Sequence, residues 1–183
     1  ENHVKEKHEP RQCYATWQKD RKERKYSASG GIAFGFYKRW IQNAGIVYGA
    51  AFNEKGILTQ QKAETLEEAR KFRGSKYVQS YNGFSYSEIG KELKKGKKVL
   101  FIGTPCQIAG LKAYLGKASD ALVTIDLICH GTPPMSYLEE YIKEIAGAEK
   151  VDRVSFRGEK DYHMVFYSQD RVVYSQRFRK DLY

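Results

Sequence analysis

The chain has 183 residues, of which 41% are hydrophobic and 14% aromatic, so it can bury one sizeable core and lacks the composition of a disordered protein. No run approaches the roughly 18 consecutive apolar residues of a transmembrane helix, and the polar N-terminus lacks the apolar centre of a signal peptide. We therefore expect a cytoplasmic protein without a membrane span.

The net charge of +10 comes mainly from three basic segments, KDRKERK (19–25), KELKKGKK (91–98) and RFRK (177–180). Such segments can bind nucleic acid or anionic cofactors. Acidic residues interrupt the first segment, and the second is the polar end of an amphipathic helix. Solvated helix faces explain them better, so we expect no nucleic-acid partner, although a non-enzymatic basic binding module remains an alternative.

The chain divides into a flexible N-terminal segment (1–12) and a single domain (13–183). It begins without Met and ends inside the strand-like run RVVYSQRFRKDLY, which indicates a fragment of a longer protein that is truncated at its C-terminus. CYATWQKD (13–20) predicts a short strand. Ile32, Phe36 and Trp40 then recur at helical spacing until Gly45, and two alternating segments around Asn53 predict a hairpin.

Two short helices are predicted next, because Thr65 with Glu68 and Ser85 with Glu88 have the spacing of a capping box. GSKYVQS (74–80) lies between them as a strand or an extended loop.

The centre of the chain alternates strand and helix. KKVLFIGTP (97–105) and ALVTIDLICHG (121–131) are apolar strands, followed by the predicted helices 105–116 and 132–147. This order is typical of adjacent parallel strands buried on both faces, and the alternating tail after residue 151 predicts antiparallel strands. The expected fold class is α/β, with a small, partly parallel central sheet flanked by helices and antiparallel strands in the C-terminal part.

The stretch GTPCQ (103–107) places a cysteine at the start of a helix. Thr104 fits the N-cap, Pro105 fits the first helical position, and Gln107 completes a capping box. Cys106 then lies in the first turn, where the helix dipole favours its thiolate. Cys129 follows the next strand in the same way, so both thiols are expected to face one crevice at the carboxyl edge of the sheet.

The three cysteines leave other interpretations open. Their odd number argues against a disulfide framework, and the lack of a CxxC pair excludes a self-contained zinc finger. Cys106 and Cys129 could instead be small buried hydrophobic residues, and Cys13 has no functional setting. In a thiol enzyme, Cys106 would be a nucleophile paired with His130 across the strands. A solvated role is the simplest interpretation of His3, His8 and His163.

Two further segments suit a phosphate ligand. SASGG (27–31) before a helix can form a nest of backbone N–H groups, and GSKY (74–77) supplies a hydroxyl, an ammonium and an aromatic ring. An ordinary loop and a surface lysine are the simpler alternatives.

Taken together, the segments 14–52, GSKYVQS, GKKVLFIGTPCQIAGLKAYLG (96–116) and LVTIDLICHGTPP (122–134) resemble the beta subunit family of coenzyme F420 hydrogenase and dehydrogenase. This family includes formate dehydrogenase beta subunits and the plant hydroxymethyl chlorophyll reductase. The CHG after the second strand resembles a bacterial branch of the family.

The resemblance implies an FAD-containing iron-sulfur flavoprotein that transfers electrons between a 4Fe-4S cluster, the flavin and a hydride-carrying substrate. It implies flavin and phosphate contacts from Ser27, Ser29, Gly30, Gly31, Ser75, Lys76 and Tyr77. It places Thr104, Pro105 and Cys106 at the cofactor crevice and makes Cys106 and Cys129 cluster ligands. Further cysteines of the family, in a ferredoxin-like segment and a later Cys-x-x-Cys, are missing here, so the remaining ligands are expected from a redox partner subunit or a ferredoxin-like segment.

Overall fold

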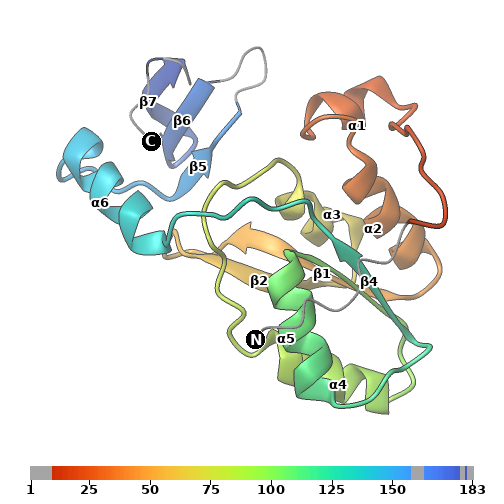
Figure 1. Ribbon diagram of the computed structural model, residues 1–183. Coiled ribbons are helices and arrows are strands. Elements are labelled where there is room, and N and C mark those ends of the chain that lie inside the picture. Colours follow the sequence, from red (N-terminus) through yellow and green to blue (C-terminus); the bar gives the residue numbers. More distant parts are fainter. Residues whose placement is uncertain (1–9, 158–162, 178–179, 181–183) are drawn as a thin grey trace.

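The computed structural model describes residues 10–157, 163–177 and 180 (Figure 1). Its elements are α1 (Arg21–Lys25), α2 (Ile32–Gln42), β1 (Ile46–Phe52), β2 (Leu58–Ala63), α3 (Leu66–Ala69), η1 (Arg70–Phe72), α4 (Ser85–Lys94), β3 (Val99–Gly103), α5 (Pro105–Leu115), β4 (Leu122–Asp126), α6 (Met135–Ala146), β5 (Arg153–Ser155), β6 (His163–Ser168) and β7 (Arg171–Arg177). The predicted flexible segment lies mostly outside the described residues, as do His3 and His8.

The first sheet has the strand order β2-β1-β3-β4. The predicted hairpin is confirmed, since β1 pairs antiparallel with β2, and the predicted parallel pair is confirmed, since β3 pairs parallel with β4 and with β1. All five residues of β3 are buried, as its continuous apolar sequence requires for a central strand. The expected α/β class with a partly parallel sheet is therefore correct.

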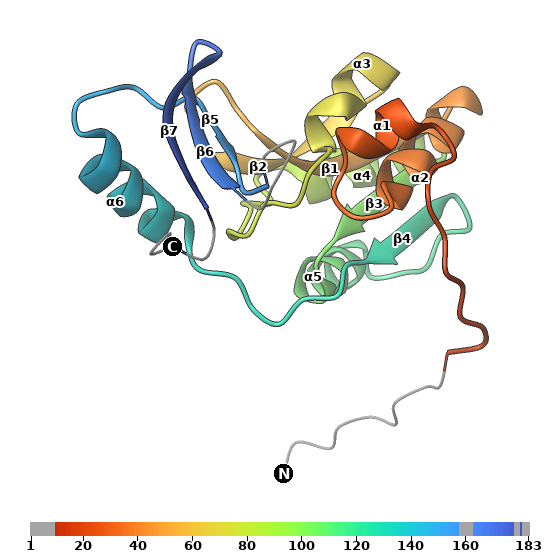
Figure 2. The same cartoon turned by 90° about the horizontal axis from the view of Figure 1, so that it is seen from above.

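Helices cover both faces of this sheet. On one face, Phe34 and Tyr37 of α2 pack with α3, η1 and the side chains of Val47 and Leu100. On the other face, α4 and α5 pack through Ile89, Ile108 and Leu111 against β1 and β3. Figure 1 shows α2 and α3 above the strands of this sheet and α4 and α5 below them, and Figure 2 shows the sheet from the side of α2 and α3.

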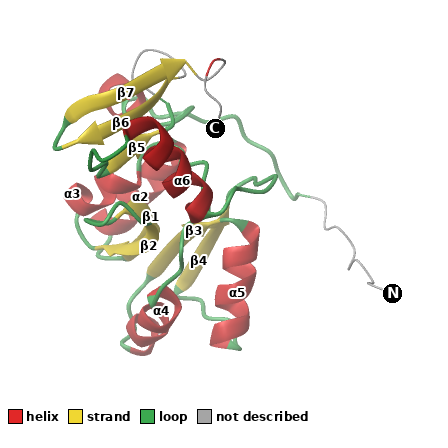
Figure 3. Cartoon of the chain, turned by 90° about the vertical axis from the view of Figure 1, so that its left-hand side faces the viewer, coloured by secondary structure: helices red, strands yellow, loops and turns green. Residues whose placement is uncertain are grey.

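The second sheet is antiparallel, with the order β5-β6-β7, as the alternating tail predicted. Helix α6 packs against it through Met135, Leu138 and Tyr141, beside Met164 and Phe166 of β6 (Figure 3). The same cluster contains Leu58 of β2 and Val78, so it joins the two sheets through a shared apolar core.

The position of α6 explains one wrong expectation. The helix begins at Met135 and covers the second sheet, so it does not shield β4, which is an edge strand of five residues. The residues of β4 are therefore half-buried or exposed, whereas the sequence predicted a strand buried on both faces. The predicted strand 121–131 therefore stops at Asp126, and the residues after it form an extended loop.

The predicted helix of Ile32, Phe36 and Trp40 is confirmed as α2; the face of α2 that packs against the sheet carries Phe34 and Tyr37, while Ile32 and Phe36 are exposed. Two local predictions were wrong. Residues 13–20 form no strand, and most of them are exposed. The second capping box is absent: Phe84 occupies the N-cap, and the buried Ser85 hydroxyl has no hydrogen-bond partner.

The first capping box, Thr65 with Glu68, is confirmed. None of the helices in the described ranges is long and apolar enough to cross a membrane.

Candidate functional site

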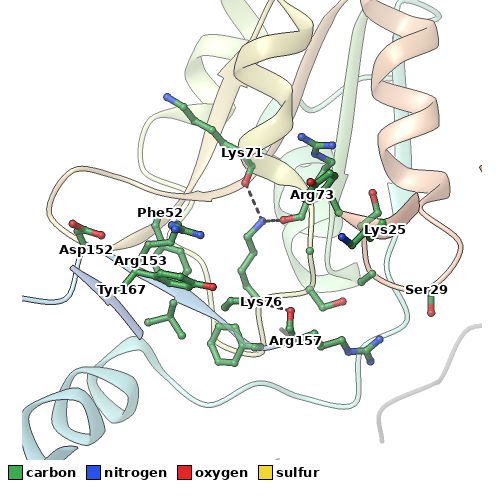
Figure 4. A pocket seen from close by; sticks show the side chains of 18 residues that line it. Lys25, Ser29, Phe52, Lys71, Arg73, Lys76, Asp152, Arg153, Arg157 and Tyr167 are labelled. Atoms are coloured by element: carbon green, nitrogen blue, oxygen red, sulfur yellow. Dashed lines mark hydrogen bonds between the residues drawn. The ribbon is translucent and has the colours of Figure 1, made fainter. Parts of the chain in front are cut away.

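A cavity of about 640 Å³ lies between the second sheet and the loops that follow α1 and η1 (Figure 4). We call it the basic cavity. Its lining residues are Lys25, Tyr26, Ser27, Ala28, Ser29, Phe52, Lys71, Arg73, Gly74, Ser75, Lys76, Asp152, Arg153, Val154, Ser155, Phe156, Arg157 and Tyr167. They come from segments more than 100 positions apart in the sequence, so only the folded chain brings them together.

Four of the residues that were expected at a flavin site line this cavity: Ser27, Ser29, Ser75 and Lys76. The two serines of the SASGG loop follow α1, whose N-cap Asp20 accepts hydrogen bonds from two backbone N–H groups of its first turn. Ser27 is fixed by donating to the Glu23 carbonyl at 2.9 Å. The structure thus brings residues of SASGG and GSKY to the same cavity.

Gly30 and Gly31 do not line the cavity, and the structure gives a different reason for each glycine. A Cβ on Gly30 would lie 2.8 Å from the Thr16 carbonyl, so the chain approaches too closely for a side chain. Gly31 is the N-cap of α2 with a φ of 70°, a left-handed conformation that favours glycine. Its N–H donates to the Ala28 carbonyl, so this amide is already used within the loop.

Lys76 is the most unusual group of the cavity. Its ammonium donates to the main-chain carbonyls of Lys71 at 3.1 Å and Arg73 at 3.0 Å, as the dashed lines of Figure 4 mark. Burial lowers the pKa of this amine to about 7. No carboxylate forms an ion pair with it in the described part of the chain, and one of its three N–H donors is left after the two carbonyls.

The charge around Lys76 is strongly positive. Six basic side chains line the cavity and Asp152 is the single carboxylate among them. Arg73 is neutralised by Glu23, at 2.8 Å, and its guanidinium lies 4.9 Å from the centre of the Phe34 ring. Asp152 accepts from the Gln169 N–H at 2.7 Å, which holds it in a turn of the second sheet. The cavity therefore favours an anionic ligand.

The second sheet contributes a wall that sequence reasoning missed. RVSFR (153–157), which we call the arginine wall, begins in β5; Val154 and Phe156 belong to the apolar core, and all five residues line the cavity. Arg153 stacks 3.8 Å from the centre of the Tyr167 ring. The signal in the sequence was two arginines four positions apart within a short alternating run, which is too common to single out.

The two thiols lie at a second place, the carboxyl edge of the parallel pair. β3 and β4 end at the paired residues Gly103 and Asp126, and Cys106 and Cys129 each follow three positions later. We call this place the thiol edge. Cys106 is exposed, with its Sγ 3.1 Å from the Thr104 hydroxyl, and half-buried Cys129 accepts from the Gly131 N–H at 3.4 Å. Thr104, Pro105 and Cys106 do not line the basic cavity.

A buried polar network supports the thiol edge from below. Gln107 Oε1 accepts from the Thr104 N–H at 3.1 Å, as the capping box predicted, and also from the Gln60 amide at 3.2 Å. The Gln107 amide donates to the Ser80 hydroxyl at 2.9 Å, and the Tyr86 hydroxyl donates to the Gln107 carbonyl at 2.7 Å. This network fixes the first turn of α5 and with it the position of Cys106.

The cysteines are not buried hydrophobic residues, because Cys13 and Cys106 are exposed and Cys129 is half-buried. Within the described ranges, no group of three or more His, Cys, Asp or Glu residues is arranged to hold a metal ion. No hydrogen bond joins Cys106 to His130, and both side chains are exposed in this part of the chain. The geometry thus adds nothing to the Cys106–His130 pair of the thiol-enzyme alternative.

The fold is that of a mixed α/β protein, with a basic cavity between the second sheet and the loops that follow α1 and η1. Residues 96–180 match the family model for the C terminus of the beta subunit of coenzyme F420 hydrogenase/dehydrogenase. The resemblance expected from the sequence is therefore confirmed over this region, which contains the thiol edge and RVSFR but not SASGG or GSKY. The family match points to a redox role.

Among solved structures, the chain is similar to one in the F420-reducing [NiFe] hydrogenase complex from Methanosarcina barkeri, determined as a xenon derivative. The TM-score is 0.58 at 19% sequence identity, and the match covers 91% of this chain and 61% of that one. At this identity the likeness establishes a shared fold, and the chain spans less than two thirds of that neighbour. No curated protein matches the chain at a significant level.

Proposed function

We propose that the protein is the flavin-binding part of an oxidoreductase subunit and that the basic cavity holds FAD. The observation that carries this proposal is Lys76, an ammonium without an ion-pair partner in the described residues, at the centre of a positively charged cavity. Burial removes this ammonium from the water that would stabilise its charge, and an anionic ligand would compensate for that loss. In this proposal the protein acts in the cytoplasm, between a redox partner subunit and a hydride-carrying substrate.

The residues present suit FAD. The volume of about 640 Å³ lies within the roughly 300–1,000 Å³ of small-molecule sites. The hydroxyls of Ser27, Ser29 and Ser75 and the remaining N–H of Lys76 are donors for phosphate oxygens, while Phe52 and Tyr167 offer apolar ring surface. These two kinds of lining match two parts of FAD, the charged pyrophosphate and an aromatic ring system.

Three of the other expected flavin residues have a supporting role in this proposal. Gly30 and Gly31 shape the serine loop, and Tyr77 packs edge-on against Phe156 of the arginine wall at 5.8 Å. When bound, the isoalloxazine supplies the hydride and electron chemistry, and the protein supplies position and electrostatics. The chain's own task is to neutralise the phosphates and to keep the ring at a fixed orientation.

The thiol edge fits a 4Fe-4S cluster only in part. Such a cluster takes four thiolates, whereas this sequence has three cysteines and places two at the thiol edge. We propose that Cys106 and Cys129 supply two ligands and that a redox partner subunit or a ferredoxin-like segment supplies the others. The exposure of Cys106 suits a site that a second segment completes.

A thiol enzyme is the second candidate, because Cys106 is exposed in the first turn of α5 beside the Thr104 hydroxyl. It predicts rapid alkylation of Cys106 by iodoacetamide at neutral pH and no dependence on a coloured cofactor. The flavin proposal predicts that alkylation of Cys106 leaves FAD binding intact, because Cys106 does not line the cavity.

The test is reconstitution of the purified protein with FAD, followed by desalting and an absorbance spectrum. We expect the two flavin bands to remain with the protein, and to disappear on desalting for Lys76→Met. A matched control is Lys95→Met, at an exposed lysine at the end of α4. Flavin that is lost from the wild type, or retained equally by Lys76→Met, would contradict the proposal.

A further inference from the structure

The arginine wall is the feature of the cavity that neither the motifs nor the family resemblance assigns. Arg153 and Ser155 lie in β5, where residues two apart point the same way, and Arg157 follows in the bend after this strand. The side chains of Arg153 and Arg157 both line the cavity. The wall therefore presents two guanidinium groups to the cavity.

The local contacts hold Arg153 in place without neutralising it fully. Its guanidinium lies over the Tyr167 ring, 3.8 Å from the ring centre, and one N–H donates to Asp170 at 3.1 Å. Asp170 is 94% exposed, so solvent screens this ion pair and it contributes little. A guanidinium has five N–H donors, which leaves Arg153 several for a ligand.

Arg157 is placed by its neighbours along the chain. Its main-chain carbonyl accepts from the Ser155 hydroxyl at 2.9 Å, and its guanidinium lies 5.5 Å from the centre of the Tyr77 ring. Tyr77 follows Lys76 directly, so this contact joins the arginine wall to the GSKY segment. Two of the segments that carry the cavity's cations are thus in contact, although they lie about 80 positions apart in the sequence.

We infer that Arg153 and Arg157 bind the phosphate or pyrophosphate group of the ligand, and that this group is held between the arginine wall of the second sheet and Lys76. Paired arginines suit such a group because a guanidinium can donate two parallel hydrogen bonds to phosphate oxygens. The inference rests on the proposed use of the basic cavity as a ligand site, but it does not require the ring of the ligand to be a flavin.

The experiment compares FAD, riboflavin and inorganic pyrophosphate by titration calorimetry on the purified protein. Riboflavin has the same ring as FAD without phosphate, so the difference in affinity measures the anion site. We expect Arg153→Met and Arg157→Met each to weaken FAD binding about tenfold, as the loss of charged hydrogen bonds predicts, and to leave riboflavin binding unchanged. Methionine keeps much of the apolar contact of Arg153 with Tyr167.

Arg171→Met is the matched control, because Arg171 is an exposed arginine of the second sheet that pairs with Glu149 and does not line the cavity. Urea unfolding of each variant checks that the second sheet stays folded. The inference is overturned if FAD and riboflavin bind equally, or if both cavity variants bind FAD like the control.

The two proposals can fail separately. If the protein binds no FAD but binds pyrophosphate, and Arg157→Met weakens that binding, the anion site is supported and the flavin proposal is contradicted. A wild-type protein that binds neither compound contradicts both.

Discussion

The basic cavity and the thiol edge are built differently, although the sequence predicted them as one crevice. The cavity is enclosed by side chains from the α1 loop, the GSKY segment and the second sheet, and its cations already contact neighbouring groups. The thiol edge lies at the open end of β3 and β4, where Cys106 is exposed and Ile128 is 92% exposed. In the supporting network beneath Cys106, the side-chain oxygen and nitrogen of Gln107 nevertheless both have hydrogen-bond partners.

This difference separates two kinds of site. The cavity has enough donors within one chain to hold a ligand, whereas the thiol edge has a rigid base and too few ligands for a cluster among the described residues. We therefore expect mutations at the cavity to act on flavin affinity, and mutations at the thiol edge to act on local stability or on assembly with a partner.

The largest effect is expected for Lys76→Met. Removal of the cavity's central ammonium should weaken FAD binding on the order of 100-fold, the upper part of the range for a hydrogen bond to a charged group. Quenching of flavin fluorescence measures the affinity, with Lys95→Met as control. A change of less than about threefold would mean that the phosphates bind elsewhere.

The next effect concerns the base of the thiol edge. Gln107→Leu leaves the Thr104 N–H, the Gln60 amide and the Ser80 hydroxyl without this partner, so we expect a loss of about 2–3 kcal/mol in the free energy of unfolding. Urea denaturation measures it. Gln79→Leu, at an exposed glutamine, should change stability by less than about 0.5 kcal/mol. Equal stability of the two variants would show that the network contributes little to the free energy of unfolding.

A smaller effect is expected from pH. The folded-state pKa of Lys76 is about 7, below its ordinary value, so the amine is mostly protonated at pH 6 and mostly neutral at pH 8. If FAD binds only the ammonium form, its affinity falls about tenfold between these two values. Arginine stays protonated throughout, so Lys76→Arg should give a flat profile. A wild-type profile that rises with pH would contradict this assignment.

In the protein without ligand, the pKa of Lys76 affects stability in the opposite direction to FAD affinity. The unfolded chain binds this proton up to the ordinary lysine pKa, while the folded chain releases it near pH 7. Stability should therefore rise with pH from about 7 to about 10, and Lys76→Met should remove that contribution.

The smallest effect on FAD affinity is expected for substitutions at the thiol edge. Cys106→Ser and Cys129→Ser should change FAD affinity less than about twofold, because neither residue lines the cavity. The same variants should lower the iron bound after anaerobic reconstitution of the protein together with its redox partner. A large loss of FAD from either variant would show that the two places form one site after all.

The sequence was most informative where local physics decides the structure. The continuous apolar run of β3, the capping box of Thr104 and Gln107, and the hairpin around Asn53 depend on neighbours along the chain, and all three were predicted. The sequence predicted α2 but not its buried face, because Phe34 and Tyr37 fit a helical period as well as Ile32 and Phe36 do, and only the position of the sheet selects between them.

The residues of the candidate site could likewise be predicted only where the signal is local in the sequence. SASGG and GSKY could be named because their residue types suit a phosphate, and the family resemblance joined them. RVSFR could not be named, since its importance depends on the second sheet meeting the GSKY segment. The low pKa of Lys76 depends on burial and was equally invisible. Flavin contacts of all these residues remain predictions.

A crystal structure of the protein with FAD tests the central claim most directly. We expect a phosphate oxygen within hydrogen-bond distance of the Lys76 ammonium, the guanidinium groups of Arg153 and Arg157 on the same pyrophosphate, and the serine loop in contact with the ligand. FAD bound at the thiol edge, or anywhere that leaves Lys76 bonded only to the carbonyls of Lys71 and Arg73, would contradict the account.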